Sequence, residues 1–215
     1  MNDTPPDARQ KLGFFLVLIL IAGGSLLILF PAWLPSSKYK ALGEDGAVEM
    51  LQLFLLILSA ALHFAAMPHA GKLSPIFSAL GFGAIAAAIG EYADTIEGLI
   101  KFIKVEWIVW PLFGIIAWKI FGNLKAFSQF WGYASKKPAA GFLLAGIIIA
   151  YVFGEVFGSK EFWQASLGTT VHREIPQVVE SYLELLACYF IFISSLGFCL
   201  PITNRRALNE SSSGT

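Results

Sequence analysis

Six long apolar stretches, separated by short polar segments, run through the 215-residue chain. A helix needs about 20 predominantly apolar residues to cross the hydrocarbon core of a bilayer. Because each stretch reaches or approaches that length, the pattern predicts an all-α polytopic membrane protein. We expect a six-helix transmembrane bundle that forms a single domain over residues 1–203. The predicted spans are Leu12–Leu34, Ala47–Met67, Pro75–Asp94, Trp107–Gly122, Ala139–Gly158 and Pro176–Leu200.

Three segments depart from a simple apolar span. The first stretch is longer than the roughly 7 to 15 apolar residues of a signal peptide and lacks a small-residue cleavage site, so it is interpreted as a span. The fourth is the shortest and contains Pro111 and Lys119, which makes its limits the hardest to assign. The Ser-rich tail, residues 204–215, has the composition of a disordered segment.

Two of the connections between spans are amphipathic rather than simply polar. Thr95–Glu106 gathers its isoleucine and leucine side chains on one helical face, with the lysines elsewhere. Asn123–Ser135 interleaves large apolar residues with polar ones. Helices of this type lie along the membrane surface. The sequence therefore predicts two interfacial helices in addition to the six spans.

The composition agrees with a membrane protein and excludes several other classes. The chain is 56% hydrophobic and only 14% charged, whereas an ordinary soluble domain has about 25% charged residues. The formal net charge is zero and no nucleic-acid-binding motif is present, so nucleic acid is excluded as a partner. Cys188 and Cys199 lie in one apolar run, which excludes a disulfide framework and a cysteine zinc site. The partners that remain are the lipid bilayer, another membrane protein and a second copy of the chain.

The Lys and Arg residues orient the predicted bundle. If the N-terminus is cytoplasmic, nine of them lie on the cytoplasmic side and six on the other, in agreement with the positive-inside rule. An even number of spans then places both termini in the cytoplasm. The carboxylates are distributed less evenly, since twelve of the fifteen fall in the outer loops or the outer halves of spans. Acidic residues contribute little to orientation, so this asymmetry needs an explanation of its own.

Several carboxylates lie inside apolar runs. Glu49 follows the opening of the second span, Glu91 lies near the end of the third, and Glu180 and Glu184 lie one turn apart in the sixth. Glu184 is about 12 Å into its span, and a charge at membrane depth costs at least about 2.5–3.5 kcal/mol. We expect such groups to face a polar cavity, where they bind a cation, pair with Lys or Arg, or stay protonated. The candidate ligand-binding residues are Glu49, Glu91, Asp94, Glu155, Glu180 and Glu184.

The favoured function is binding or conduction of a cation, a proton or a cationic solute by this outward-facing carboxylate cluster. The inner halves of the fifth and sixth spans offer few polar groups, which argues against a path through the whole membrane. The simpler interpretation, that the acids are only solvated, fits those at the ends of loops better than those inside the spans.

Two other functions stay open. One is a membrane-embedded, metal-dependent hydrolase acting on a lipid-linked substrate, with His172 and Glu174 in its metal site. A single histidine among carboxylates favours Ca²⁺, Mg²⁺ or Mn²⁺ as the cofactor, while the simpler interpretation is a loop histidine that pairs with a neighbouring acid. No H-E-x-x-H, G-x-S-x-G or phosphate-binding glycine motif is present, so the sequence does not establish an enzyme. The other is a non-catalytic subunit of a larger membrane complex.

Four short motifs occur in order along the chain: EDGAVE, GEYAD, GSKEFWQASLG and VVESYLELL. In this order they resemble a group of uncharacterised bacterial multipass inner-membrane proteins. The resemblance covers most of residues 41–200 and implies a common fold and a location in the bacterial inner membrane. It implies no activity. The residues to which it draws attention are Glu49, Glu91, Asp94, Glu180 and Glu184.

Overall fold

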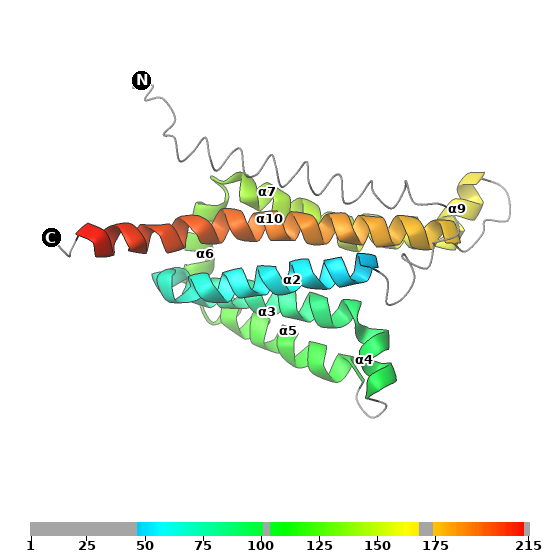
Figure 1. The fold of residues 1–215 in the computed structure, drawn as a ribbon, viewed down its shortest axis with the longest axis horizontal. Coiled ribbons are helices and arrows are strands. Elements are labelled where there is room, and N and C mark those ends of the chain that lie inside the picture. The colour runs from blue at the N-terminus through cyan, green and yellow to red at the C-terminus, as the bar shows by residue number, and fades with distance from the viewer. Residues whose placement is uncertain (1–46, 101–103, 168–173, 213–215) are drawn as a thin grey trace, which may run out of the picture. The chain divides into compact units, whose positions relative to one another are not determined.

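A computed structural model of the chain describes residues 47–100, 104–167 and 174–212. All of these residues belong to one compact unit, Lys40–Thr215. Every regular element within the described ranges is a helix (Figure 1), so the predicted all-α class is confirmed. The first predicted span, Leu12–Leu34, lies outside the described residues.

Short breaks divide the described chain into helices that follow the apolar stretches. Two long helices, α3 and α7, have proline in the first turn, where its missing N–H costs no helical hydrogen bond. In chain order the helices are α2 Ala47–Ala66, η3 Met67–His69, η4 Gly71–Leu73, α3 Ser74–Glu91, α4 Ala93–Leu99, α5 Glu106–Phe121, α6 Leu124–Ala134, α7 Pro138–Ile148, the π-helical turn η5 Ile149–Gly154, α8 Glu155–Gly158, α9 Lys160–Leu167 and α10 Glu174–Ser212.

The lengths and hydropathy of these helices indicate a membrane protein. Helices α5 and α6 reach the length of a span only together, and they are bent by 85° at the break between them. The described residues therefore contain four candidate spans, or five if the bent pair is counted as one. The four are Val48–His69, Gly71–Glu91, Pro138–Gly158 and Pro176–Ile202.

The bend between α5 and α6 has a local cause at Gly122. A Cβ built on this residue would lie 2.7 Å from Trp118 O, which is too close for any side chain. The Gly122 N–H donates to the same carbonyl at 2.8 Å and ends α5. The predicted fourth span, Trp107–Gly122, is thus helical, but the chain turns away before it becomes long enough to cross a bilayer alone.

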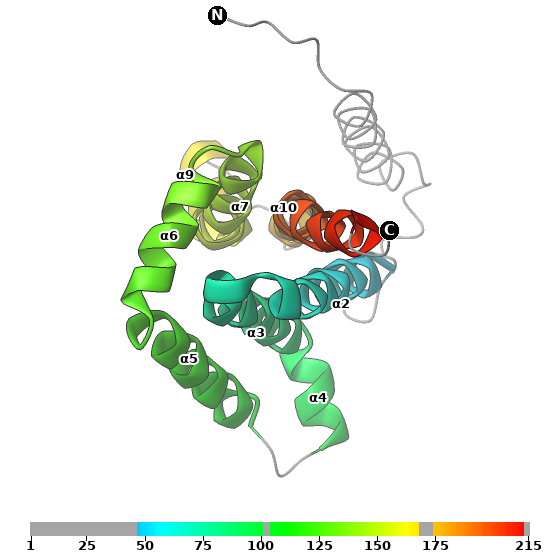
Figure 2. The same ribbon diagram turned by 90° about the vertical axis from the view of Figure 1, so that its left-hand side faces the viewer.

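Helix α2 lies at the centre of the bundle, packed between α3 and α10, while α5 packs on α3 and α7 packs on α10 (Figure 2). Helices α2 and α10 run parallel, because Gln52 bonds to Ser181 near their starts and His63 bonds to Ser195 further along. The short connection through η3 and η4 makes α3 antiparallel to α2. Consequently the end where α2 and α10 begin is also the end where α3 stops.

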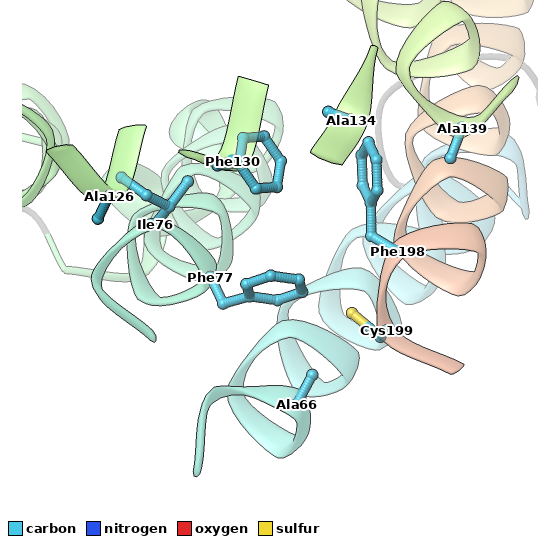
Figure 3. Close-up of a cluster of buried hydrophobic side chains, with 9 residues drawn as sticks. All are labelled: Ala66, Ile76, Phe77, Ala126, Phe130, Ala134, Ala139, Phe198 and Cys199. Atoms are coloured by element: carbon cyan, nitrogen blue, oxygen red, sulfur yellow. The ribbon is translucent and has the colours of Figure 1, made fainter. Parts of the chain in front are cut away.

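An aromatic cluster closes the opposite end of the bundle. Phe77 of α3, Phe130 of α6 and Phe198 of α10 converge (Figure 3), with ring centroids 6.0 Å apart for Phe77 and Phe130 and 5.4 Å apart for Phe130 and Phe198. The predicted helix at Asn123–Ser135 is therefore present as α6, which buries Ala126, Phe130 and Ala134 against the bundle. Its other large apolar side chains, Leu124, Phe127 and Trp131, are exposed. Its location at the membrane surface stays a prediction.

The other predicted amphipathic helix, Thr95–Glu106, is wrong in its second half. Helix α4 continues only to Leu99, because Ile100 leaves the helical region with φ −123° and ψ 78°. The Val105 N–H donates to Glu97 Oε1 at 2.9 Å, so a side chain and not a helical hydrogen bond leads into α5. At the C-terminal end, by contrast, α10 continues to Ser212, through a segment whose composition predicts disorder.

Candidate functional site

Three helices bring carboxyl groups to the end of the bundle where α2 and α10 begin and α3 stops. Glu49 lies in the first turn of α2, Glu91 is the last residue of α3, and Glu180 and Glu184 lie on α10. All four side chains are partly buried. Glu49 and Glu180 both act electrostatically on Glu91 and on Glu184. We refer to these four residues as the carboxyl cluster.

Glu184 has the most partners within the carboxyl cluster. Its side chain lies within reach of the side chains of Glu91 and Gln52 and interacts with both. Gln52 is fully buried, and its Nε2 donates to Ser181 O at 3.3 Å. Gln52 Oε1 has no hydrogen-bond partner among the described residues.

A hydrogen bond between Glu91 and Glu184 would require a proton. Two ionised carboxylates offer only acceptors, so a bond between them forms only when at least one is in the acid form. The groups that act electrostatically on both members of the pair are Glu49 and Glu180, which are carboxyl groups themselves. A proton held between Glu91 and Glu184 is one way in which this arrangement could be stabilised.

Glu180 lies at the edge of the carboxyl cluster, against α8. A Cβ built on Gly158 would lie 2.7 Å from Glu180 Cδ, so this glycine leaves the space in which the carboxyl group lies. Glu155 acts electrostatically on Glu180 but is itself exposed. Glu155 consequently lies beside the cluster and not within it.

The remaining candidate residues fall where side chains are not described. The side chains of Asp94 and Glu174 and the whole of His172 lie outside the described residues, so their roles stay predictions. In the part of the chain that the structure describes, no group of three or more His, Cys, Asp or Glu side chains has the arrangement of a metal site. The carboxyl cluster is therefore not a ready-made set of metal ligands.

A second buried polar group lies between α2 and α10, further from their starts. His63 Nε2 lies 3.1 Å from Ser195 Oγ, and His63 Nδ1 lies 3.5 Å from Cys199 Sγ. Ser195 Oγ also lies 2.8 Å from Ile191 O. Its single hydroxyl proton can be donated either to this carbonyl or to His63 Nε2, and the tautomer of His63 decides which ring nitrogen donates.

The spacing of polar residues along two apolar helices points to this second group. Polar residues recur at intervals of seven and four on both α2 and α10, which puts each set on one helical face. The expectation of few polar groups in the inner halves of the fifth and sixth spans is therefore incomplete, because the sixth span and the second together supply a buried polar group. The residues are Gln52, Ser59 and His63 on α2 and Cys188, Ser195 and Cys199 on α10.

Comparison with known proteins gives no family assignment. No protein family, no curated protein and no solved structure matches the chain. The resemblance to bacterial inner-membrane proteins therefore stays an expectation, and the function has to be argued from the carboxyl cluster and its surroundings.

Proposed function

We propose that this membrane protein uses its carboxyl cluster to bind a proton reversibly from the extracytoplasmic side of a bacterial inner membrane. The observation that carries the proposal is the convergence of the Glu91 and Glu184 carboxyl groups, which interact with each other and with Glu49 and Glu180 and would be joined by a shared proton. Binding and release of this proton would change the charge of the cluster by one unit. Ionisable groups at membrane depth serve in this way in proton-linked transport and sensing.

A proton fits the cluster better than a divalent cation does. The side chains come from three helices, but the described residues form no metal-binding arrangement. Glu184 already interacts with Gln52, which is a neutral amide, and with the carboxyl group of Glu91. A divalent cation or a cationic solute would have to displace the proton and break the hydrogen bond between Glu91 and Glu184.

The other functions considered from the sequence are a hydrolase that uses His172 and Glu174 and a subunit of a larger complex. No observation on the described residues favours either, because one depends on side chains outside them and the other on a partner. Proton binding is the function that can be tested on the chain by itself.

The experiment is an acid–base titration of the detergent-purified chain from about pH 3 to about pH 11, a range that covers carboxyl groups in all environments. The Glu91→Gln/Glu184→Gln variant is compared with Glu106→Gln/Glu161→Gln, in which two exposed carboxyl groups are removed instead. Both variants lose two titrating groups, so only the pH at which the protons are lost distinguishes them. We expect different curves, because one pair shares a proton. Superimposable curves would contradict the proposal.

A second titration separates a proton from a metal ion as the occupant. Ca²⁺, Mg²⁺ and Mn²⁺ are added in turn to wild-type protein at constant pH, and the released protons are counted. We expect no stoichiometric release. Release of about one proton per chain that is absent from Glu91→Gln/Glu184→Gln would identify a metal-ion site instead.

A further inference from the structure

A hollow opens at the end of the bundle opposite the carboxyl cluster, between the turn that leads into α3 and the corner where α5 meets α6. Its volume is about 920 Å³, and Lys72, Ser74, Asn123, Lys125 and Gln129 supply its polar lining. Two glycines shape its walls. Gly71 has a φ of +54°, and Gly122 approaches Trp118 O too closely for a Cβ. We refer to this hollow as the elbow pocket.

The positive charge of the elbow pocket has no local compensation. Neither Lys72 nor Lys125 forms an ion pair with any described residue, and both are exposed. The sequence contains no Asp or Glu in residues 67–90 or 107–154, the segments from which the pocket and its surroundings are built. Two lysines that converge on a hollow without a carboxylate partner favour an anionic ligand.

Backbone groups add to this preference. Helix α6 begins at the pocket, and no side chain caps its first N–H groups. The Asn123 amide, which precedes α6, donates instead to Lys119 O at 3.0 Å. The first turn of a helix carries partial positive charge and N–H groups without helical partners. These N–H groups favour an anionic ligand, as the two lysines do.

The surroundings of the pocket indicate where the anion comes from. The pocket lies at the start of the candidate span Gly71–Glu91 and at the end of α5. If this helix crosses a bilayer, its ends lie near the lipid headgroups. Phe121 and Leu124 form part of its wall and are 72% and 59% exposed. Apolar side chains beside a cationic hollow suit a ligand with a charged head and hydrocarbon chains.

We propose that the elbow pocket binds the phosphate of an anionic phospholipid, with Lys72 and Lys125 as its charged contacts and Phe121 and Leu124 beside the acyl chains. This site is independent of the carboxyl cluster, because the two lie at opposite ends of the bundle. If the lipid proposal fails, the proton-binding proposal is unaffected. If the proton-binding proposal fails, the lipid proposal is likewise unaffected.

The test is native mass spectrometry of the detergent-purified full-length chain with phosphatidylglycerol, phosphatidylcholine of the same chain length, or inorganic phosphate. We expect wild type to prefer phosphatidylglycerol. Lysines near an anionic lipid surface each contribute about fivefold in affinity. The Lys72→Gln/Lys125→Gln variant should therefore bind phosphatidylglycerol about 25-fold more weakly, and Lys125→Gln alone about fivefold more weakly. The charge-conserving variant Lys72→Arg/Lys125→Arg should keep the preference.

The matched control is Lys136→Gln/Lys137→Gln, which removes the same charge just beyond the far end of α6. We expect it to change the affinity by less than about twofold, because neither Lys136 nor Lys137 lines the elbow pocket. An equal loss in both double variants would overturn the proposal in favour of unspecific surface attraction. Complete displacement of phosphatidylglycerol by millimolar inorganic phosphate, or binding of phosphate alone, would identify a site for a soluble anion instead.

Discussion

Replacement of Glu184 distinguishes a proton-sharing carboxyl pair from a cluster of mutually repelling charges. If the pair shares a proton, Glu91 loses its hydrogen-bond partner in Glu184→Ala and Gln52 loses one of two. A partly buried polar group that loses its partner costs about 1–3 kcal/mol. Because Gln52 keeps its bond to Ser181 O, we expect a total loss of about 2–4 kcal/mol.

Glu184→Gln should behave differently, because an amide has the same shape and carries both a donor and an acceptor. Its NH₂ group can donate to Glu91 and its oxygen can accept from Gln52, so both hydrogen bonds are replaced without a shared proton. We expect the stability of this variant to stay within about 1 kcal/mol of wild type.

The assay is thermal unfolding in detergent, followed by helical circular dichroism. A loss of about 2–4 kcal/mol corresponds to a fall in Tm of roughly 5–15 °C for a chain of this length. Glu161→Ala removes an exposed carboxyl group on α9 and should change the stability by less than about 0.5 kcal/mol. The reasoning is refuted if Glu184→Gln is as unstable as Glu184→Ala. It is equally refuted if Glu184→Ala is more stable than wild type, since repulsion would then dominate the cluster.

The same unfolding assay tests two contacts elsewhere in the bundle. In Gly197→Ala the new Cβ would lie 2.8 Å from the Cβ of Ala139, so α7 and α10 must separate, and we expect a loss of about 1–3 kcal/mol. Gly141→Ala on α7 meets no atom within 4 Å and should gain up to about 1 kcal/mol from helix propensity, so equal effects of the two would contradict this packing. Ser195→Ala removes the hydrogen-bond partner of the buried His63 Nε2 and should cost about 1–3 kcal/mol, whereas an unchanged Tm would show that this nitrogen has another partner.

The sequence predicts the helices well, because the length and composition of each apolar run are enough to locate a helix. Apolar runs of nearly constant composition predict the four candidate spans within about four residues at each end, although α10 continues beyond its predicted span to Ser212. The change of direction after Gly122 is also predicted, since a span ends there and an interfacial helix follows. Its angle of 85° is not, because it depends on the close approach of Gly122 to Trp118 O. A glycine in an apolar run looks the same in sequence whether it packs against a neighbour or turns the chain.

The carboxyl groups were easier to find than their partners. Glutamate inside an apolar run has a large insertion cost, so Glu91 and Glu184 stood out without any structure. Gln52 shares a helical face with Glu49, so the sequence predicts it as a possible partner of the carboxyl groups, but it does not reveal which of them Gln52 contacts. The partners of His63 are not predicted, because one polar residue on an apolar helix does not reveal which neighbour it faces. Only the parallel packing of α2 against α10 brings Gln52 to Glu184 and His63 to Ser195.

The most direct test of the proton-binding proposal is the infrared spectrum of the purified protein at neutral pH. A carboxylic acid and a carboxylate absorb in separate regions, so a protonated glutamate is visible without a label. If Glu91 and Glu184 share a proton, wild type shows a carboxylic-acid carbonyl band that weakens when either residue is replaced by glutamine and stays unchanged in Glu161→Gln. A wild-type spectrum without such a band, or with a band that survives both replacements, would contradict proton binding at this pair.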